Sequence, residues 1–150
     1  MFTDIKTRIA LYIRAGEEEQ RESSNSIRFQ EERLLGFIKS QHDVILEDSH
    51  IYKDNSLSGT LPIESRPALK KLFEDGANGE FDVVYVLKLD RFSQKTSLLI
   101  NGIDKLKELN IELRSITESF ISTTPTGMFM TSIIGAITEF ELGIRKQYRK

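Results

Sequence analysis

Apolar and polar positions follow two patterns along the chain, and these predict strands and helices in turn. The segments predicted as strands lie at 8–13, 44–52, 81–90 and 111–116. The segments with apolar residues at helical spacing, predicted as helices, lie at 26–40, 65–76 and 97–110. Because strands alternate with helices, the sequence predicts an α/β domain with a mainly parallel sheet and helices on both faces.

Residues that start and stop helices support these boundaries. Ser26 suits the N-cap of the first helix. Ser65 suits the N-cap of the second, with Pro67 in its first turn and Gly76 or Gly79 at its end.

Polar segments follow the first three predicted strands, at 14–20, 54–59 and 88–94. In a parallel sheet the loops after the carboxyl ends of the strands meet at one edge, so we expect these segments to converge. They and their neighbours in sequence carry a set of polar side chains, namely Arg14, Asp54, Ser58, Arg66, Asp90 and Arg91, with Gln20 and Gln30 nearby. A guanidinium is always charged and presents a planar fork of donors, so the set predicts a site for an oxyanion, above all a phosphate.

A helical pattern without proline covers 127–150 and differs from the others. Its apolar stripe consists of Phe129, Ile133, Ile137, Phe140 and Ile144, and its end is basic, with Arg145, Lys146, Arg149 and Lys150. One interpretation is a core helix with a charged end that suits the helix dipole. The other is an oligomerisation helix whose far end reaches a polyanion, and a length of about 36 Å favours it. We therefore expect a domain over 1–125 and an interface helix over 126–150.

Composition narrows the chemistry. The 150 residues are 39% hydrophobic and 29% charged, as in ordinary globular domains, and the net charge of −2 argues against a surface that is basic all over. The chain has no cysteine, no GxxxxGK[ST] phosphate loop and no carboxylate cluster typical of a two-metal nuclease. We expect metal-free handling of a phosphodiester with no cofactor. Without a signal-peptide core or an apolar run of membrane length, we expect a cytoplasmic protein that binds no membrane.

Five ordered motifs resemble those of the serine recombinases, in particular the N-terminal catalytic domain of the large members. YIRAGEEEQ, from Tyr12, is similar to Y-x-R-V-S-[ST]-x-x-Q, and SIRFQ, from Ser26, to S-I-x-x-Q. The remaining matches are YKDNSLSG…SRPAL to D-x-x-x-S-G with R-P, KLDRFSQ to K-L-D-R-L-S-R, and TPTGMFMTSIIGAITEFE to a segment ending in E-F-E-R. The resemblance runs in register from Arg8 to about Arg145.

The resemblance implies a specific chemistry. In this family a serine attacks a DNA phosphodiester and forms a 5′-phosphoserine link, while arginines stabilise the charge without a metal. A tetramer holds the cut ends and exchanges strands by rotation. The long helix makes dimer contacts, and its basic end approaches the minor groove. We accordingly expect double-stranded DNA and other subunits as partners, and a DNA-binding region after Lys150.

Three positions depart from the family pattern. Gly16 stands where the family has its nucleophilic serine, and Gln94 and Leu142 stand where it has arginines. The resemblance assigns catalytic positions to Arg14, Arg66, Asp90 and Arg91, and supporting ones to Tyr12, Gln20, Gln30, Asp54, Ser58 and Glu141. The candidates for a substitute nucleophile, by closeness in sequence, are Ser23, Ser24, Ser26 and Ser58. We expect Ser26 to cap a helix instead, and Ser58 to support the site rather than attack.

These observations favour a recombinase-type domain that has lost strand cleavage and keeps oligomerisation and phosphate binding. It would act as a homo-dimer or tetramer, as a non-cutting partner of an active recombinase, or as a DNA-binding regulator. One alternative is an active recombinase or integrase, with an engineered Gly16 or an unusual site. Another is an interaction module whose long helix pairs with another chain without contacting DNA.

Overall fold

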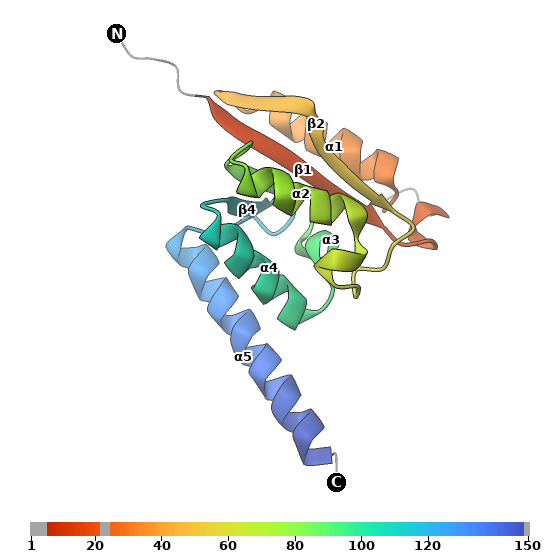
Figure 1. Cartoon of the computed structure of the whole chain (residues 1–150), viewed down its shortest axis with the longest axis vertical. Coiled ribbons are helices and arrows are strands. Elements are labelled where there is room, and N and C mark those ends of the chain that lie inside the picture. The colour runs from red at the N-terminus through yellow and green to blue at the C-terminus, as the bar shows by residue number, and fades with distance from the viewer. Residues whose placement is uncertain (1–5, 22–24, 149–150) are drawn as a thin grey trace.

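A mainly parallel sheet forms the centre of the domain (Figure 1), in a computed structural model that describes residues 6–21 and 25–148. Within these residues the sheet has five strands in the order β2-β1-β3-β4-β5. The strands are β1 (Thr7–Ala15), β2 (Val44–Asn55), β3 (Val83–Val86), β4 (Glu112–Ser115) and β5 (Phe120–Ile121). The first four pair in parallel, and β5 pairs with β4 in the antiparallel sense. The predicted fold class is confirmed.

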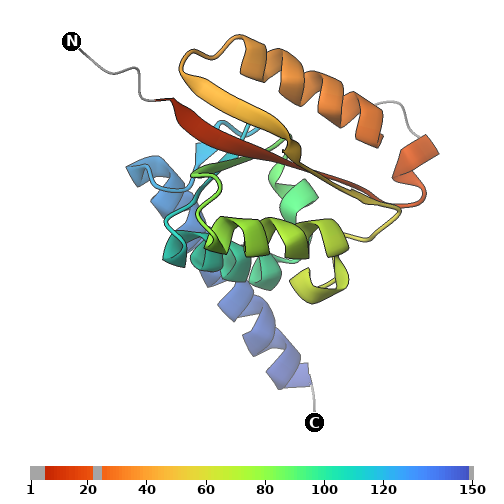
Figure 2. The same ribbon diagram turned by 45° about the horizontal axis from the view of Figure 1, so that its top comes forward.

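Helices cover both faces of the sheet, as predicted. The helices are α1 (Ile27–Lys39), α2 (Pro67–Ala77), α3 (Leu89–Phe92), α4 (Thr96–Glu108) and α5 (Pro125–Tyr148), with 3-10 turns at Glu19–Arg21 and Ile63–Ser65. Helix α1 lies on one face, and α2 and α4 lie on the other (Figure 2).

Strand β1, which lies between β2 and β3, contributes to a core on each face. Ile9 and Leu11 pack toward Leu34 of α1, whereas Ala10 and Tyr12 belong to the core under α2 and α4. Alternate residues of a strand point to opposite faces, and a strand covered on both sides is apolar throughout. This explains why β1 is an almost unbroken apolar run that ends in the buried Arg14.

The start of α2 differs from the prediction. Ser65 does not cap the helix: Arg66 stands at the N-cap and makes no side-chain capping bond. The free N–H groups of Ala68 and Leu69 instead donate to the Asp54 carboxylate, at 2.8 and 3.0 Å. Strand β2 runs three residues past its predicted end and carries Asp54 to this helix. Sequence spacing does not show such a cap, because donor and acceptor are 14 and 15 residues apart.

Other predicted helix ends are confirmed. The Ser26 Oγ accepts a hydrogen bond of 3.1 Å from the Phe29 N–H at the start of α1. Helix α2 ends at Ala77, and Gly79 follows with φ at +72°, a backbone conformation that suits glycine. Gly76 lies inside the helix and does not end it.

Two short elements were not predicted. Strand β3 ends at Val86, and part of the segment 88–94 forms the short helix α3 rather than a loop. The Leu89 N–H donates to the Glu118 carboxylate at 3.2 Å, which satisfies one amide at the start of this helix. Strand β5 has two residues, too few for an alternating pattern to show.

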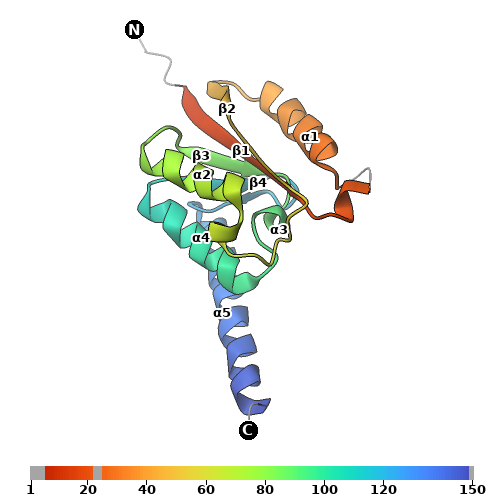
Figure 3. The same cartoon turned by 45° about the vertical axis from the view of Figure 1, so that its right-hand side comes forward.

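Helix α5 leaves the body of the domain, and its second half projects into solvent (Figures 1 and 3). It begins at Pro125, two residues before the predicted start, and proline suits a first helical turn. Met130 and Ile134 pack against the core under α4. The predicted stripe faces outward, with Phe129 and Phe140 exposed by 66% and 69%, so α5 is not a core helix.

In length and composition, Pro125–Ile144 would also suit a membrane-spanning helix, the one such segment among the described residues. Met130 and Ile134, on the inner side of this helix, pack against the core of the domain instead of facing outward. The expectation that the chain binds no membrane stays a prediction.

Candidate active site

Three arginines from separate segments meet where the parallel strands end. Arg14 comes from the end of β1, Arg66 precedes α2, and Arg91 lies in α3. All three are buried, with at most 3% of their surface exposed. The polar segments expected to converge therefore do so, and the sheet gathers their positive charge at one edge.

Arg14 joins the three loops through backbone oxygens. Its Nε donates to the Arg91 carbonyl at 3.1 Å, and its two Nη atoms donate to the carbonyls of Leu57 and Asp90 at 3.0 and 2.9 Å. Gly59 makes room for this side chain, because a Cβ there would lie 2.7 Å from Arg14 Nη2. Burial lowers the pKa of Arg14, and repulsion by Arg91 and Arg66 adds to the effect.

Arg66 is held against Tyr12. Its Nη2 donates to the Tyr12 hydroxyl oxygen at 2.9 Å, and its guanidinium lies 5.3 Å from the centre of the ring. The hydroxyl in turn donates to Asp54 Oδ2 at 2.7 Å. Burial raises the pKa of Tyr12 above its usual value, so the phenol stays protonated. The Phe92 carbonyl also accepts from Arg66 Nη2.

Arg91 connects Asp90 to the segment that follows β1. Its Nε donates to Asp90 Oδ1 at 2.9 Å, and its Nη1 donates to the Arg14 carbonyl at 3.2 Å. Its Nη2 lies 2.7 Å from Glu19 Oε2. Burial alone would lower the pKa of Arg91, but hydrogen bonds to Glu19 and Asp90 raise it.

Gly16 lies next to the same carboxylate. Its N–H donates to Glu19 Oε1 at 2.9 Å, and this oxygen is 3.6 Å from Arg14 Nη1. The Glu19 carboxylate therefore bridges the position of the expected nucleophile and two of the arginines. Partial burial opposes its ionisation, but hydrogen bonds from Arg91 and Gly16 hold the pKa of Glu19 below its usual range.

The residues expected to support the site differ in burial: Gln30 is buried, whereas Ser58 is exposed. Gln30 is buried, and its Nε2 donates to the carbonyls of Arg14 and Asn25 at 2.8 and 2.9 Å. Ser58 is exposed, and its Oγ pairs with Thr60 Oγ1 at 2.8 Å. Gln30 thus fixes the end of β1 directly, whereas the Ser58 hydroxyl pairs with Thr60 in its own loop.

The two positions that lack the family's arginines share one surface hollow. Gln94 and Leu142 both line a cavity of about 210 Å³ between the start of α4 and α5, together with Glu141. The Thr96 Oγ1 donates to Glu141 Oε2 at 3.3 Å across it. The Gln94 N–H also donates to the Gly59 carbonyl at 2.9 Å, which links this hollow to the loop around Arg14.

Several predicted residues cannot be placed. The side chains of Gln20, Arg145 and Lys146 lie outside the described part of the structure, as do Arg149 and Lys150 altogether. The candidate hydroxyls of Ser23 and Ser24 lie outside it too. Among residues 6–21 and 25–148, no three His, Asp or Glu side chains are grouped as metal ligands. The expectation of metal-free chemistry stays a prediction.

The sequence reasoning missed Glu19 and Gly59 as parts of this site. Glu19 is one of three consecutive glutamates, and a run of acidic residues usually indicates a solvated surface. The feature that could have indicated a role for Glu19 is its place three residues after Gly16, in a loop expected to meet arginines. Gly59 is the glycine of the D-x-x-x-S-G match, and the close approach of Arg14 explains why a side chain would not fit there.

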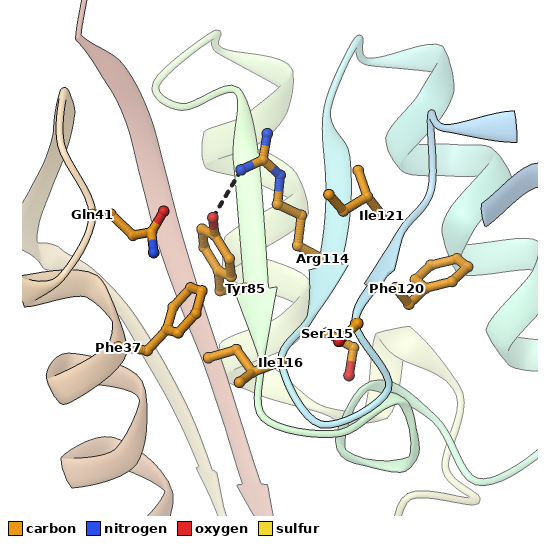
Figure 4. A pocket seen from close by; sticks show the side chains of 9 residues that line it. Phe37, Gln41, Tyr85, Arg114, Ser115, Ile116, Phe120 and Ile121 are labelled. Atoms are coloured by element: carbon orange, nitrogen blue, oxygen red, sulfur yellow. Dashed lines mark hydrogen bonds between the residues drawn. The ribbon is translucent and has the colours of Figure 1, made fainter. Parts of the chain in front are cut away.

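A larger hollow of about 250 Å³ lies elsewhere, on the α1 side of β3, β4 and β5 (Figure 4). Phe37 and Tyr85 form part of its wall, and Arg114 Nη1 donates to the Tyr85 hydroxyl at 2.8 Å. Arg114 Nε is 2.5 Å from Glu112 Oε2. The hollow shares no residue with the arginine cluster.

Fold and site together define an α/β domain that concentrates buried arginines where its parallel strands end, an arrangement suited to binding an anion. Residues 9–150 match the family model described as the resolvase N-terminal domain. The chain therefore belongs to the resolvase, or serine recombinase, family.

Individual relatives agree with this assignment. The chain is 29% identical over 119 residues to the "Probable DNA-invertase y4cG" of Sinorhizobium fredii, covering 74% of this chain and 38% of that protein. It is 35% identical over 88 residues to the serine recombinase gin of Escherichia phage Mu, covering 59% of this chain and 44% of that protein. The matches thus span about two fifths of these curated relatives.

The crystal structure of the N-terminal catalytic domain of TP901-1 integrase has a similar fold. The TM-score is 0.77 at 30% identity, and the match covers 91% of this chain and 98% of that one. The likeness extends over nearly the whole of a solved catalytic domain.

Proposed function

We propose that this domain binds double-stranded DNA and associates with other recombinase subunits, but does not itself cut DNA. The observation that carries the proposal is Gly16, which stands at the family's nucleophile position while Arg14, Arg66 and Arg91 are retained. Glycine has no atom that could attack phosphorus. A fold and a charged site kept without a nucleophile suit binding rather than cleavage.

The size of the expected loss supports this. Removing the nucleophile of a serine hydrolase costs on the order of 10⁶ in rate. Removing one preorganised donor to a developing charge costs about 2.7–4 kcal/mol. The missing arginines at Gln94 and Leu142 would lower the cleavage rate further. Rate losses at residues that act together are not additive, so the total is smaller than the sum of the separate losses.

The two candidate hydroxyls that the structure describes have other partners, which supports the proposal. The Ser26 Oγ is engaged as the cap of α1. The Ser58 Oγ accepts from the Thr60 N–H at 3.1 Å and pairs with Thr60 Oγ1 at 2.8 Å. Both support the view that cleavage has been lost.

The exposed face of α5 supports a role for a second subunit. Its stripe of Phe129, Ile133, Ile137, Phe140 and Ile144 is open to solvent in the single chain. Burying such residues against a like helix is favourable by about 1.5–3 kcal/mol for each side chain fully buried. A homo-dimer, a tetramer or a hetero-oligomer with an active recombinase would each cover the stripe, with DNA near the basic end of the helix in the cytoplasm.

The test asks whether protein becomes covalently attached to DNA. The full-length protein is incubated with the end sequences of its own element, quenched with denaturant and examined for DNA-linked protein, beside Gly16→Ser and the triple variant Gly16→Ser, Gln94→Arg, Leu142→Arg. We expect no adduct with the natural protein. An adduct with the natural protein would overturn the proposal and identify an active enzyme with an unusual site.

The variants separate the remaining alternatives. An adduct with Gly16→Ser alone would mean that the rest of the site is competent, as for an engineered glycine. An adduct with the triple variant only would show that Gln94 and Leu142 matter as well. DNA affinity that does not fall with added salt would favour an interaction module that makes no phosphate contacts.

A further inference from the structure

Glu19 uses both carboxylate oxygens to hold the site together. Oε1 accepts from the Gly16 N–H at 2.9 Å and lies 3.6 Å from Arg14 Nη1, while Oε2 lies 2.7 Å from Arg91 Nη2. A backbone amide and two guanidinium groups around a pair of oxygens form the kind of donor set that also binds a phosphate. The carboxylate thus fills an anion site with an anion from the same chain.

The arginines are closed off from solvent in this arrangement. The side chains of Arg14 and Arg91 are 1% and 4% exposed, whereas that of Glu19 is 24% exposed. A phosphate arriving from solvent would meet the negative charge of Glu19 and could not reach either guanidinium. A phosphate can therefore bind Arg14 and Arg91 only after the Glu19 carboxylate has moved away from them.

Gly16 lies close against the Glu19 carboxylate. A Cβ at position 16 would lie 3.3 Å from Glu19 Oε1, so the carboxylate would have to move by a few tenths of an ångström. With glycine at this position, the carboxylate sits against the backbone N–H without that adjustment.

We propose that Glu19 is an internal ligand of the arginine cluster, which occupies the place of a phosphate and keeps backbone phosphates of DNA out until the segment after β1 rearranges. The proposal rests on the DNA-binding function proposed above and adds a control on it. The internal carboxylate competes at a high effective concentration, because it is attached three residues from Gly16. DNA held elsewhere on the chain would present its phosphates at a comparable effective concentration and could displace it, whereas free phosphate would compete poorly.

The experiment compares Glu19→Gln with Glu18→Gln in the full chain. Glu18 is exposed and adjacent to Glu19 in sequence. The Glu18→Gln substitution changes the net charge by the same amount as Glu19→Gln, so it controls for long-range electrostatics. Inorganic phosphate is titrated while the guanidinium Nε–Hε NMR signals of Arg14 and Arg91 are followed. We expect Glu19→Gln to bind phosphate on the order of tenfold or more tightly than the natural protein, the equivalent of one lost charge-assisted pair, and Glu18→Gln to match the natural protein.

A second variant guards against loss of folding. Glu19→Asp keeps the charge but shortens the side chain by one methylene, so it cannot span from Gly16 to Arg91 in the same way. We expect it to bind phosphate more tightly than the natural protein too. Equal phosphate affinity in folded Glu19→Gln, Glu19→Asp and the natural protein would overturn the proposal.

A DNA titration distinguishes this failure from failure of the proposed function. Duplex DNA bound equally by Glu19→Gln and the natural protein, with a steep salt dependence, would keep the DNA-binding function and reject the role of Glu19. Tighter phosphate binding in Glu19→Gln, with no duplex binding by either protein, would keep the role of Glu19 and reject the DNA-binding function.

Discussion

The Tyr12 hydroxyl donates a hydrogen bond of 2.7 Å to Asp54 Oδ2, from strand β1 to its neighbour β2. The same carboxylate accepts the first free N–H groups of α2. The hydroxyl oxygen accepts from Arg66, which precedes that helix. One buried carboxylate therefore sets the positions of two strands, a helix start and a candidate site arginine.

Replacing Asp54 with alanine should destabilise the domain strongly. The change removes a helix cap, worth about 0.5–2 kcal/mol, and takes the acceptor away from the buried Tyr12 hydroxyl that also binds Arg66. Leaving a buried hydrogen-bonding group unsatisfied costs about 1–3 kcal/mol. Urea unfolding of Asp54→Ala should show a loss in that range. Ser65→Ala is the matched control, because Ser65 occupies the predicted cap position without capping, and we expect a change within about 0.5 kcal/mol.

Gly59→Ala should also be destabilising. The new methyl group would lie 2.7 Å from Arg14 Nη2 and 2.7 Å from Gln94 Cγ, so the loop or the arginine must shift. Overpacking of this kind costs about 1–3 kcal/mol. Gly36→Ala, inside α1 with no atom within 4 Å of the new Cβ, should instead stabilise by about 0.5–1 kcal/mol. Thermal unfolding of the two variants should shift the melting temperature in opposite directions, and a shared direction would contradict the close-approach argument.

Stability should fall in acid partly through Asp75. Burial opposes its ionisation, but the Tyr52 hydroxyl at 2.6 Å and the Lys71 ammonium at 3.0 Å hold the pKa of Asp75 below its usual range. A carboxylate with a depressed folded-state pKa stabilises above its unfolded-state pKa, and this contribution is lost as the pH falls through the folded value. We therefore expect the contribution to be fully present above about pH 4 and to decrease as the pH falls further, toward the lower folded-state pKa of Asp75. Asp75→Asn should lower stability at pH 7 and make the fall toward pH 3 shallower, as measured by urea unfolding; an unchanged acid slope would count against it.

The exposed stripe of α5 should mediate self-association. Phe140→Asp places a charge on a residue that is 69% exposed in the single chain and would be buried in an assembly. Losing one such apolar contact corresponds to about 10- to 100-fold in dissociation constant. Sedimentation velocity should show the natural chain associating at micromolar concentration and Phe140→Asp as a monomer. Ser132→Asp, an exposed change off the stripe on the same helix, should leave association intact; a natural chain that stays monomeric throughout would reject the interface.

The sequence predicts the framework well because strand and helix patterns are local. Local spacing predicts the apolar run of β1, the helix capped at Ser26 and the apolar stripe of α5. The outward direction of that stripe is found in the structure. Asp54 as the cap of α2 could not be predicted, because it joins residues distant in sequence through the paired strands. For the same reason, the order of strands and loops predicted that the arginines would meet, but not that Glu19 would lie between Gly16 and two of them. That contact depends on how one side chain folds back over Gly16.

Gly127, at the base of α5, helps to fix the direction of the helix. A side chain there would collide with the carbonyl oxygen of Ile121, so the helix sits close against the edge strand β5. The helix has 24 residues and works as a lever about 36 Å long, so a tilt of about 10° at its base would carry its tip about 6 Å. Along a duplex that distance is about two base steps, at about 3.4 Å each. One absent side chain thus sets the direction of the helix, and on a duplex bound as proposed above, a bulkier residue at position 127 would bring the far end of α5 to a different base step.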